Sequence, residues 1–157
     1  MNIRFLGCVA ALALVACGGS GPSPAASPPS DEQTATTTPT TFSEQVTLGQ
    51  TLYGQHCADC HGSSGQGTGD APAVVGLDKG ALPLDPPSNA KFRKSQFKTV
   101  ADIADFVVKN MPPNKGGSLS SEEYLAILAF DLKANGIDLG DKKLDLALAA
   151  TLEVPRK

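Results

Sequence analysis

Cys57-Ala58-Asp59-Cys60-His61 is the stretch of sequence that decides how the rest of the chain is interpreted. On a helix, side chains three and four positions apart lie on one face, so the two sulfur atoms and the His61 ring project together. Three kinds of site use cysteine pairs at this spacing: a redox-active dithiol, half of a zinc site, and the attachment point of a c-type haem.

The histidine that directly follows the second cysteine favours haem attachment. In this motif the two sulfurs reach the vinyl groups of one porphyrin edge and the histidine is directed towards the iron. A zinc site needs a second pair of ligands, and His56 is the only other histidine. A thioredoxin-like dithiol should sit in a βαβ pattern, which is absent. We therefore predict one covalent haem c, bound by Cys57 and Cys60 with His61 as an axial ligand.

The opposite face of the iron needs a second ligand, for which Met111 is the candidate. His56 directly precedes Cys57, so it should not reach that face and is expected to be solvated. Apart from Met1, Met111 is the only methionine. It stands in the polar turn Asn110-Met111-Pro112-Pro113, a poor place for a methionine that merely fills a core.

Three helices are predicted around these residues, and no strand pattern competes. The first begins near Phe42 with Ser43 as its cap, and contains Gly49. The second helix begins at a capping box of Thr99 and Asp102 and ends before Pro112-Pro113. The third begins at a capping box of Ser120 and Glu123 and stops at Asn135-Gly136. Residues 62–89 are rich in Gly, Pro and Ser, and a loop of this length is expected to wrap something.

The N-terminal segment is predicted to be an export signal and a tether. Residues 1–16 contain Arg4 and an apolar run that is too short to cross a bilayer, which takes about 20 residues. Leu14-Val15-Ala16-Cys17 resembles a bacterial lipobox, which implies a lipoprotein signal peptide of residues 1–16 and lipidation of Cys17. The alternative is an ordinary signal peptide with an incidental cysteine. Residues 17–42 are rich in Ser, Thr and Pro, and are predicted to be the lipid anchor and a disordered tether.

Composition fits one small domain with appendages. The 157 residues carry a formal net charge of -3, which gives no case for nucleic-acid binding. The chain has no Trp and only 5% aromatic residues, so its core should be thin and a large cofactor could fill it. We assign the folded domain to residues 43–136, followed by a C-terminal extension, residues 137–157, whose structure the sequence does not indicate.

Residues 43–136 resemble a class I cytochrome c domain, which is monohaem and His/Met-ligated. The matching motifs occur in the family's order: Gly49-x-x-x-Tyr53, Cys57 to His61 with Gly62, Pro72-x-Val74-x-Gly76, Asn110-Met111-Pro112, and Leu119-Ser120-x-Glu122-Glu123-Tyr124. The resemblance implies a small all-α, cytochrome c-like fold of three main helices wrapped around one covalent haem, with long loops between them.

The resemblance also implies roles for single residues. The first and last helices should cross with Gly49 opposite the Tyr124 region. The Pro72 carbonyl should accept a hydrogen bond from the His61 ring and so fix its orientation. Tyr53 and Val74 should belong to the haem pocket, although the family usually has Leu at the position of Val74.

These expectations point to a one-electron carrier and not to an enzyme. Occupied axial positions leave no substrate site, and a peroxidase would need a second site that one haem motif cannot supply. The alternatives are a haem-based gas sensor or ligand binder, if Met111 does not hold the iron, and the cytochrome subunit of a periplasmic dehydrogenase. The closing stretch to Asn135-Gly136 resembles domains that accompany such dehydrogenases.

The expected partners are redox proteins (a dehydrogenase, reductase or oxidase) and, through the N-terminal lipid, a bacterial membrane. The domain should then face the periplasm or the cell exterior. Six basic residues are candidates for a docking face that binds an acidic redox partner; the alternative is that they are scattered, solvated side chains. These residues are Lys79, Lys91, Arg93, Lys94, Lys98 and Lys115.

Overall fold

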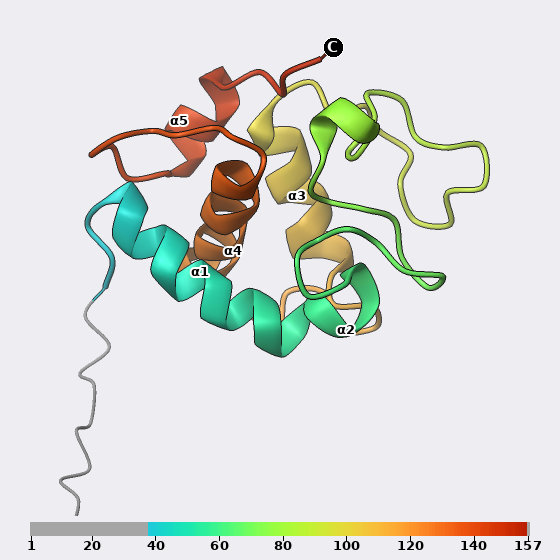
Figure 1. Cartoon of the computed structure of the whole chain (residues 1–157), viewed down its shortest axis with the longest axis horizontal. Coiled ribbons are helices and arrows are strands. Elements are labelled where there is room, and N and C mark those ends of the chain that lie inside the picture. The colour runs from blue at the N-terminus through green and yellow to red at the C-terminus, as the bar shows by residue number, and fades with distance from the viewer. Residues whose placement is uncertain (1–37, 157) are drawn as a thin grey trace, which may run out of the picture. The chain divides into compact units, whose positions relative to one another are not determined.

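The computed structural model describes residues 38–156, and in this part the protein is helical (Figure 1). The signal peptide of residues 1–16, Cys17 and the predicted tether up to residue 37 lie outside the described residues. The helices are α1 (Phe42–His56), α2 (Ala58–His61), α3 (Val100–Asn110), α4 (Ser121–Ala134) and α5 (Leu146–Thr151), with a 3-10 turn, η1 (Leu77–Lys79). Within residues 38–156 the only β pairing is an isolated bridge between Thr99 and Glu153. The predicted all-α fold is confirmed.

None of the helices in residues 38–156 combines the length and the apolar character needed to cross a membrane.

Capping boxes begin the three main helices, and one of them differs from the sequence-based prediction. The cap of α1 is Thr41, not Ser43. The Thr41 hydroxyl accepts a hydrogen bond from the Glu44 N–H at 3.3 Å, and the Glu44 carboxylate accepts from the Thr41 N–H at 3.1 Å. Ser43 could not form this reciprocal pair, because Val46 stands three residues after it. The boxes at Thr99 and Ser120 are as predicted.

Helices α1 and α4 cross at Gly49, as the family resemblance implied (Figure 1). A β-carbon added to Gly49 would lie 1.9 Å from the carbonyl oxygen of Ala126, so the two backbones are in direct contact there. One turn further along each helix, the rings of Tyr53 and Phe130 pack with their centroids 5.1 Å apart. This crossing fixes the end of α1 from which the cysteine motif continues.

The C-terminal extension packs into the same core as the helices. The Gln45 side chain is buried on α1 and forms two hydrogen bonds to the backbone of Leu144, from Nε2 to the carbonyl at 2.9 Å and from the Leu144 N–H to Oε1 at 2.7 Å. Leu144, Ala149 and Val154 are buried together with apolar residues of α3 and α4. Residues 137–156 therefore complete the hydrophobic core.

Candidate haem-binding site

The cysteine motif occupies its own helical turn, α2, directly after α1. Cys57 ends α1, where its N–H donates to the Tyr53 carbonyl, and its own carbonyl accepts from the His61 N–H at 2.9 Å. Cys57 and Cys60 are free thiols, and both are half-buried. The structure thus brings both thiols and the imidazole of His61 onto one short helix.

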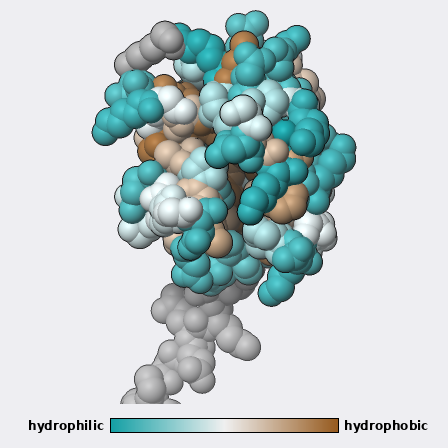
Figure 2. All heavy atoms as spheres, turned by 90° about the vertical axis from the view of Figure 1, so that its right-hand side faces the viewer, coloured by the Kyte–Doolittle hydropathy of each residue, from teal (hydrophilic) through white to brown (hydrophobic). Residues whose placement is uncertain are grey.

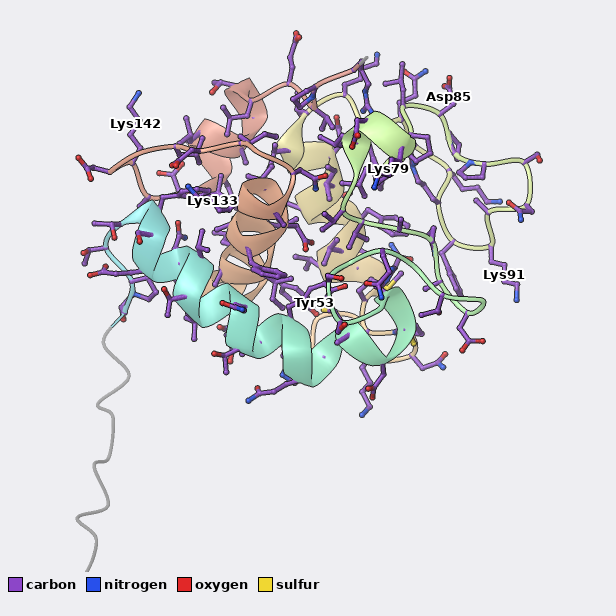
Figure 3. The ribbon with its side chains drawn as sticks, viewed as in Figure 1. Tyr53, Lys79, Asp85, Lys91, Lys133 and Lys142 are labelled. Atoms are coloured by element: carbon purple, nitrogen blue, oxygen red, sulfur yellow. The ribbon has the colours of Figure 1, made fainter. Side chains whose placement is uncertain are left out.

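Hydrogen bonds from three other residues hold the end of α2. The Tyr53 hydroxyl donates to the Gly62 carbonyl at 2.9 Å, and Figure 3 shows Tyr53 directed from α1 towards this region. The Gly67 N–H donates to the carbonyl of His61 at 2.7 Å, and the Thr68 hydroxyl donates to the carbonyl of Cys60. Because these bonds fill the carbonyls that a helix end leaves free, the motif has a fixed orientation. Nothing in the sequence indicates this role of Thr68, because it lies in a loop without a periodic pattern.

The ring of His61 is oriented by the Pro72 carbonyl, as the resemblance implied. His61 Nδ1 lies 2.7 Å from the Pro72 oxygen. A carbonyl can only accept a hydrogen bond, so the proton resides on Nδ1 and Nε2 is left as the nitrogen that can bind a metal. Such a partner fixes the tautomer of a ligating histidine and raises its basicity.

The segment that carries Pro72 is anchored to α4 by Asn135. The Asn135 Oδ1 accepts from the backbone N–H groups of Gly76 at 2.8 Å and Leu77 at 3.1 Å, and its Nδ2 donates to the Val74 carbonyl at 2.9 Å. The Val74 side chain is half-buried and packs on the cluster that contains Tyr53. Asn135 was predicted only to end a helix, because nothing in the sequence connects it to a loop about sixty residues away.

Met111 stands at the C-terminal end of α3 and is held there by Tyr124 of α4. The buried Tyr124 hydroxyl donates to the Met111 carbonyl at 2.8 Å and accepts from the Gly117 N–H at 3.1 Å. The loop after Met111 approaches the end of α1, because Pro112 lines a shallow recess together with His56. His56 itself is exposed, as predicted.

The environment of Cys57 is unlike that of a reactive dithiol. Burial, and secondarily the negative charge of Asp131, raises the pKa of Cys57 to about 12. Redox-active and nucleophilic cysteines have a lowered pKa, because the thiolate is the reactive form. A second alternative was a zinc half-site, and residues 38–156 contain no group of three or more His, Cys, Asp or Glu side chains placed to hold a metal ion.

The proposed docking residues do not share one environment. Lys79, Lys91, Lys94, Lys98 and Lys115 are exposed, and Figure 3 shows Lys91 at the edge of the long loop. Arg93, in contrast, is buried, and its guanidinium donates to the Leu84 and Ser95 carbonyls and stacks 3.5 Å from the centre of the Phe97 ring. Including Arg93 in a docking face was therefore wrong, since its charge is used within the fold.

The donor set fits a covalent haem. Two free thiols stand one helical turn apart, the neighbouring histidine has one ring nitrogen tied to a carbonyl, and a methionine is fixed at the end of another helix. Apolar side chains show between the hydrophilic residues that cover the face seen in Figure 2. A small all-α domain with this donor set defines a class of protein, the c-type cytochrome domain.

Comparison with known proteins specifies the family. Residues 44–130 match the sequence model of the family described as "Cytochrome C oxidase, cbb3-type, subunit III", and the chain belongs to this family of c-type cytochromes. The chain accordingly carries covalently attached haem c.

A solved structure supports the same fold. The crystal structure of the sulfane dehydrogenase SoxCD from Paracoccus pantotrophus contains a chain with 29% identity and a TM-score of 0.53. The match covers 70% of this chain and 53% of that one, so the present protein spans about half the length of its structural relative. No curated protein matches the chain at a significant level.

Proposed function

We propose that this protein is a one-electron carrier whose haem is attached through Cys57 and Cys60 and ligated by His61 and Met111. The observation that carries the proposal is the hydrogen bond of His61 Nδ1 to the Pro72 carbonyl, which leaves Nε2 as the metal-binding atom. The second ligand is assigned to Met111 because Tyr124 holds its backbone at the end of α3.

The chain's residues would hold the cofactor and limit its chemistry. When bound, the haem supplies a one-electron iron couple, whose potential is raised by a methionine ligand and by burial. Pro72 keeps the His61 ring in one tautomer, and Tyr53 fixes the turn that bears the thiols. If His61 and Met111 both held the iron, a bound haem would offer a substrate no free coordination position, which would suit electron transfer and not turnover.

The domain is further proposed to be exported and tethered to a bacterial membrane. The support is the sequence Leu14-Val15-Ala16-Cys17 after a short apolar run, followed by the Ser/Thr/Pro-rich residues 17–42. A lipid on Cys17 would place the cytochrome domain on the periplasmic or outer side of a membrane. There it would shuttle electrons between redox proteins.

A second candidate is a cytochrome subunit of a periplasmic dehydrogenase. The observation in its favour is the 29% identity to a chain of the SoxCD sulfane dehydrogenase. In that case the partner would be a fixed catalytic subunit. Purification of the native complex distinguishes the two, because a carrier is recovered as a single chain and a subunit remains with a stoichiometric dehydrogenase.

Absorption spectra of the mature protein, oxidised and reduced, test the ligand assignment. We expect a sharp c-type α band after reduction and, in the oxidised form, the weak red charge-transfer band of a sulfur–iron bond. Met111→Ala should remove that band, whereas Lys115→Ala, an exposed change in the same loop, should leave it. A high-spin spectrum that shifts with carbon monoxide in the unmodified protein would refute ligation by Met111 and favour a gas sensor.

Membrane fractionation tests the tether. Cys17→Ser should release the cytochrome into the soluble fraction and remove lipid from the mature N-terminus. Cys8→Ser is the matched control, because Cys8 lies within the predicted signal peptide and should not affect anchoring. Equal release of both variants, or of neither, would contradict lipidation at Cys17.

A further inference from the structure

Asp131 of α4 is a carboxylate for which the proposed function has no use. Its Oδ1 atom is buried and has no hydrogen-bond partner among residues 38–156. Buried carboxylates are normally paired with a cation or a hydrogen-bond donor, because an isolated buried charge is costly. A carboxylate kept in this position therefore requires an explanation.

The cavity beside Asp131 does not solvate it. The cavity has a volume of about 20 Å³, which is room for roughly one water molecule. Its wall contains two polar side chains, Asp131 and Asn135, and the Asn135 amide already takes part in four hydrogen bonds. A water there would find only Asp131 among the side chains with unused hydrogen-bonding capacity. Buried waters keep two to four polar partners, so the carboxylate stays poorly hydrated.

The groups that face Asp131 supply no compensating positive charge. From the α1 side the titratable groups are the Tyr53 hydroxyl, which donates to the Gly62 carbonyl, and the Cys57 thiol. Every other element that lines the cavity contributes apolar side chains: Leu77, Leu82, Val100, Ile103, Leu128, Leu132, Ile137 and Val154. Burial consequently raises the pKa of Asp131 to about 8. The charge of Asp131 also acts on Cys57, which places the carboxylate close to the haem attachment turn.

We propose that Asp131 is a redox-linked proton site, whose carboxylate takes up one proton when the domain takes up one electron. The proposal rests on the haem site of the proposed function. On reduction, a donor protein loses one electron, the iron changes from the ferric to the ferrous state, and an O–H bond forms at Asp131 with a proton from water. Reoxidation reverses both changes. The coupling follows from charge: an added electron makes the interior more negative and so favours the protonated acid.

The midpoint potential of the haem-loaded protein, measured against pH by spectroelectrochemistry, tests the coupling. We expect the potential to be constant in acid and to fall as pH rises between about pH 7 and pH 10, by at most 59 mV per unit, which is the value for one proton per electron. Asp131→Asn should abolish this slope and match the unmodified protein at the acidic end, where Asp131 is neutral. Asp141→Asn removes an exposed carboxylate and should keep the slope.

Infrared redox-difference spectra provide a test that needs no substitution. In protein labelled with carbon-13 aspartate carboxyl groups, reduction at about pH 9, above the pKa of Asp131, should produce a label-shifted band of a protonated carboxylic acid. The proposal is overturned by a pH-independent potential, by a slope that persists in Asp131→Asn, or by the absence of the acid band. Each of these results leaves a normal c-type spectrum and the proposed function intact. A protein without a reversible c-type couple would overturn the proposed function as well.

Discussion

Gly49→Ala gives the sharpest test of the packing, because Gly54→Ala makes the same chemical change on the same helix. The added β-carbon at Gly49 would lie 1.9 Å from the Ala126 carbonyl oxygen, whereas nothing lies within 4 Å of one at Gly54. Carbon atoms in ordinary contact stand about 3.5 Å from their neighbours, so α1 and α4 would have to separate locally by roughly 1.5 Å. No side-chain rotation can relieve this contact, because the obstacle is backbone.

The two variants should therefore change stability in opposite directions. Overpacking of this kind costs about 1–3 kcal/mol, and the backbone contact puts Gly49→Ala at the upper end of that range. Gly54→Ala should stabilise the protein by up to about 1 kcal/mol, because alanine favours a helix interior over glycine.

Urea denaturation of the haem-loaded variants, followed by circular dichroism, measures both changes. A lower midpoint for Gly49→Ala and a higher midpoint for Gly54→Ala, each relative to the unmodified protein, is the expected pair. Equal midpoints for the two variants would refute the direct contact between α1 and α4.

Three further predictions concern buried polar groups. Burial raises the pKa of Asp131 from 3.8 to about 8, so between these two pH values the folded state binds more protons than the unfolded state. The free energy of unfolding should therefore fall by on the order of 5 kcal/mol as pH rises from about 4 to about 8. In denaturation experiments, Asp131→Asn should remove this pH dependence. Asn135→Ala and Gln45→Ala should each lower the free energy of unfolding by about 2–4 kcal/mol, because each removes hydrogen bonds to backbone groups. Only Asn135→Ala should also shift the signal of the His61 ring proton in magnetic resonance spectra. A shift in both variants would contradict a positioning role for Asn135. Tyr53→Phe should lower stability by about 1–2 kcal/mol because a buried carbonyl loses its donor, and an unchanged unfolding midpoint would contradict this.

The sequence predicts those parts of the structure that depend on local patterns. The capping boxes at Thr99 and Ser120 were found because the partner residues stand three positions apart. The first cap was predicted at Ser43 because serine is a common cap and the acidic Glu44 follows it. The capping-box spacing instead selects Thr41, because Glu44 stands three positions after it. The bond between His61 and Pro72 was anticipated through the family resemblance and not through local chemistry.

The sequence does not predict features that depend on contacts between distant segments. Asp131 lies on a helix with exposed lysine and glutamate residues, and only the packing of η1 and α3 against α4 shows that its carboxylate is enclosed. Asn135 and Gln45 each bond to backbone far away in the chain, which no periodicity indicates. Helix α5 is six residues long, too short for a pattern to stand out.

The pairing of Gln45 with Leu144 also sets the smallest piece of this protein that can be transferred to another one. The matched family region ends at residue 130, yet a segment cut there would lose the backbone partner of Gln45 and the apolar residues that close the core, Leu144, Ala149 and Val154. A gene fusion or a domain swap that followed the family boundary would move an incomplete cytochrome. A transferable form of this domain must therefore include the residues up to Val154.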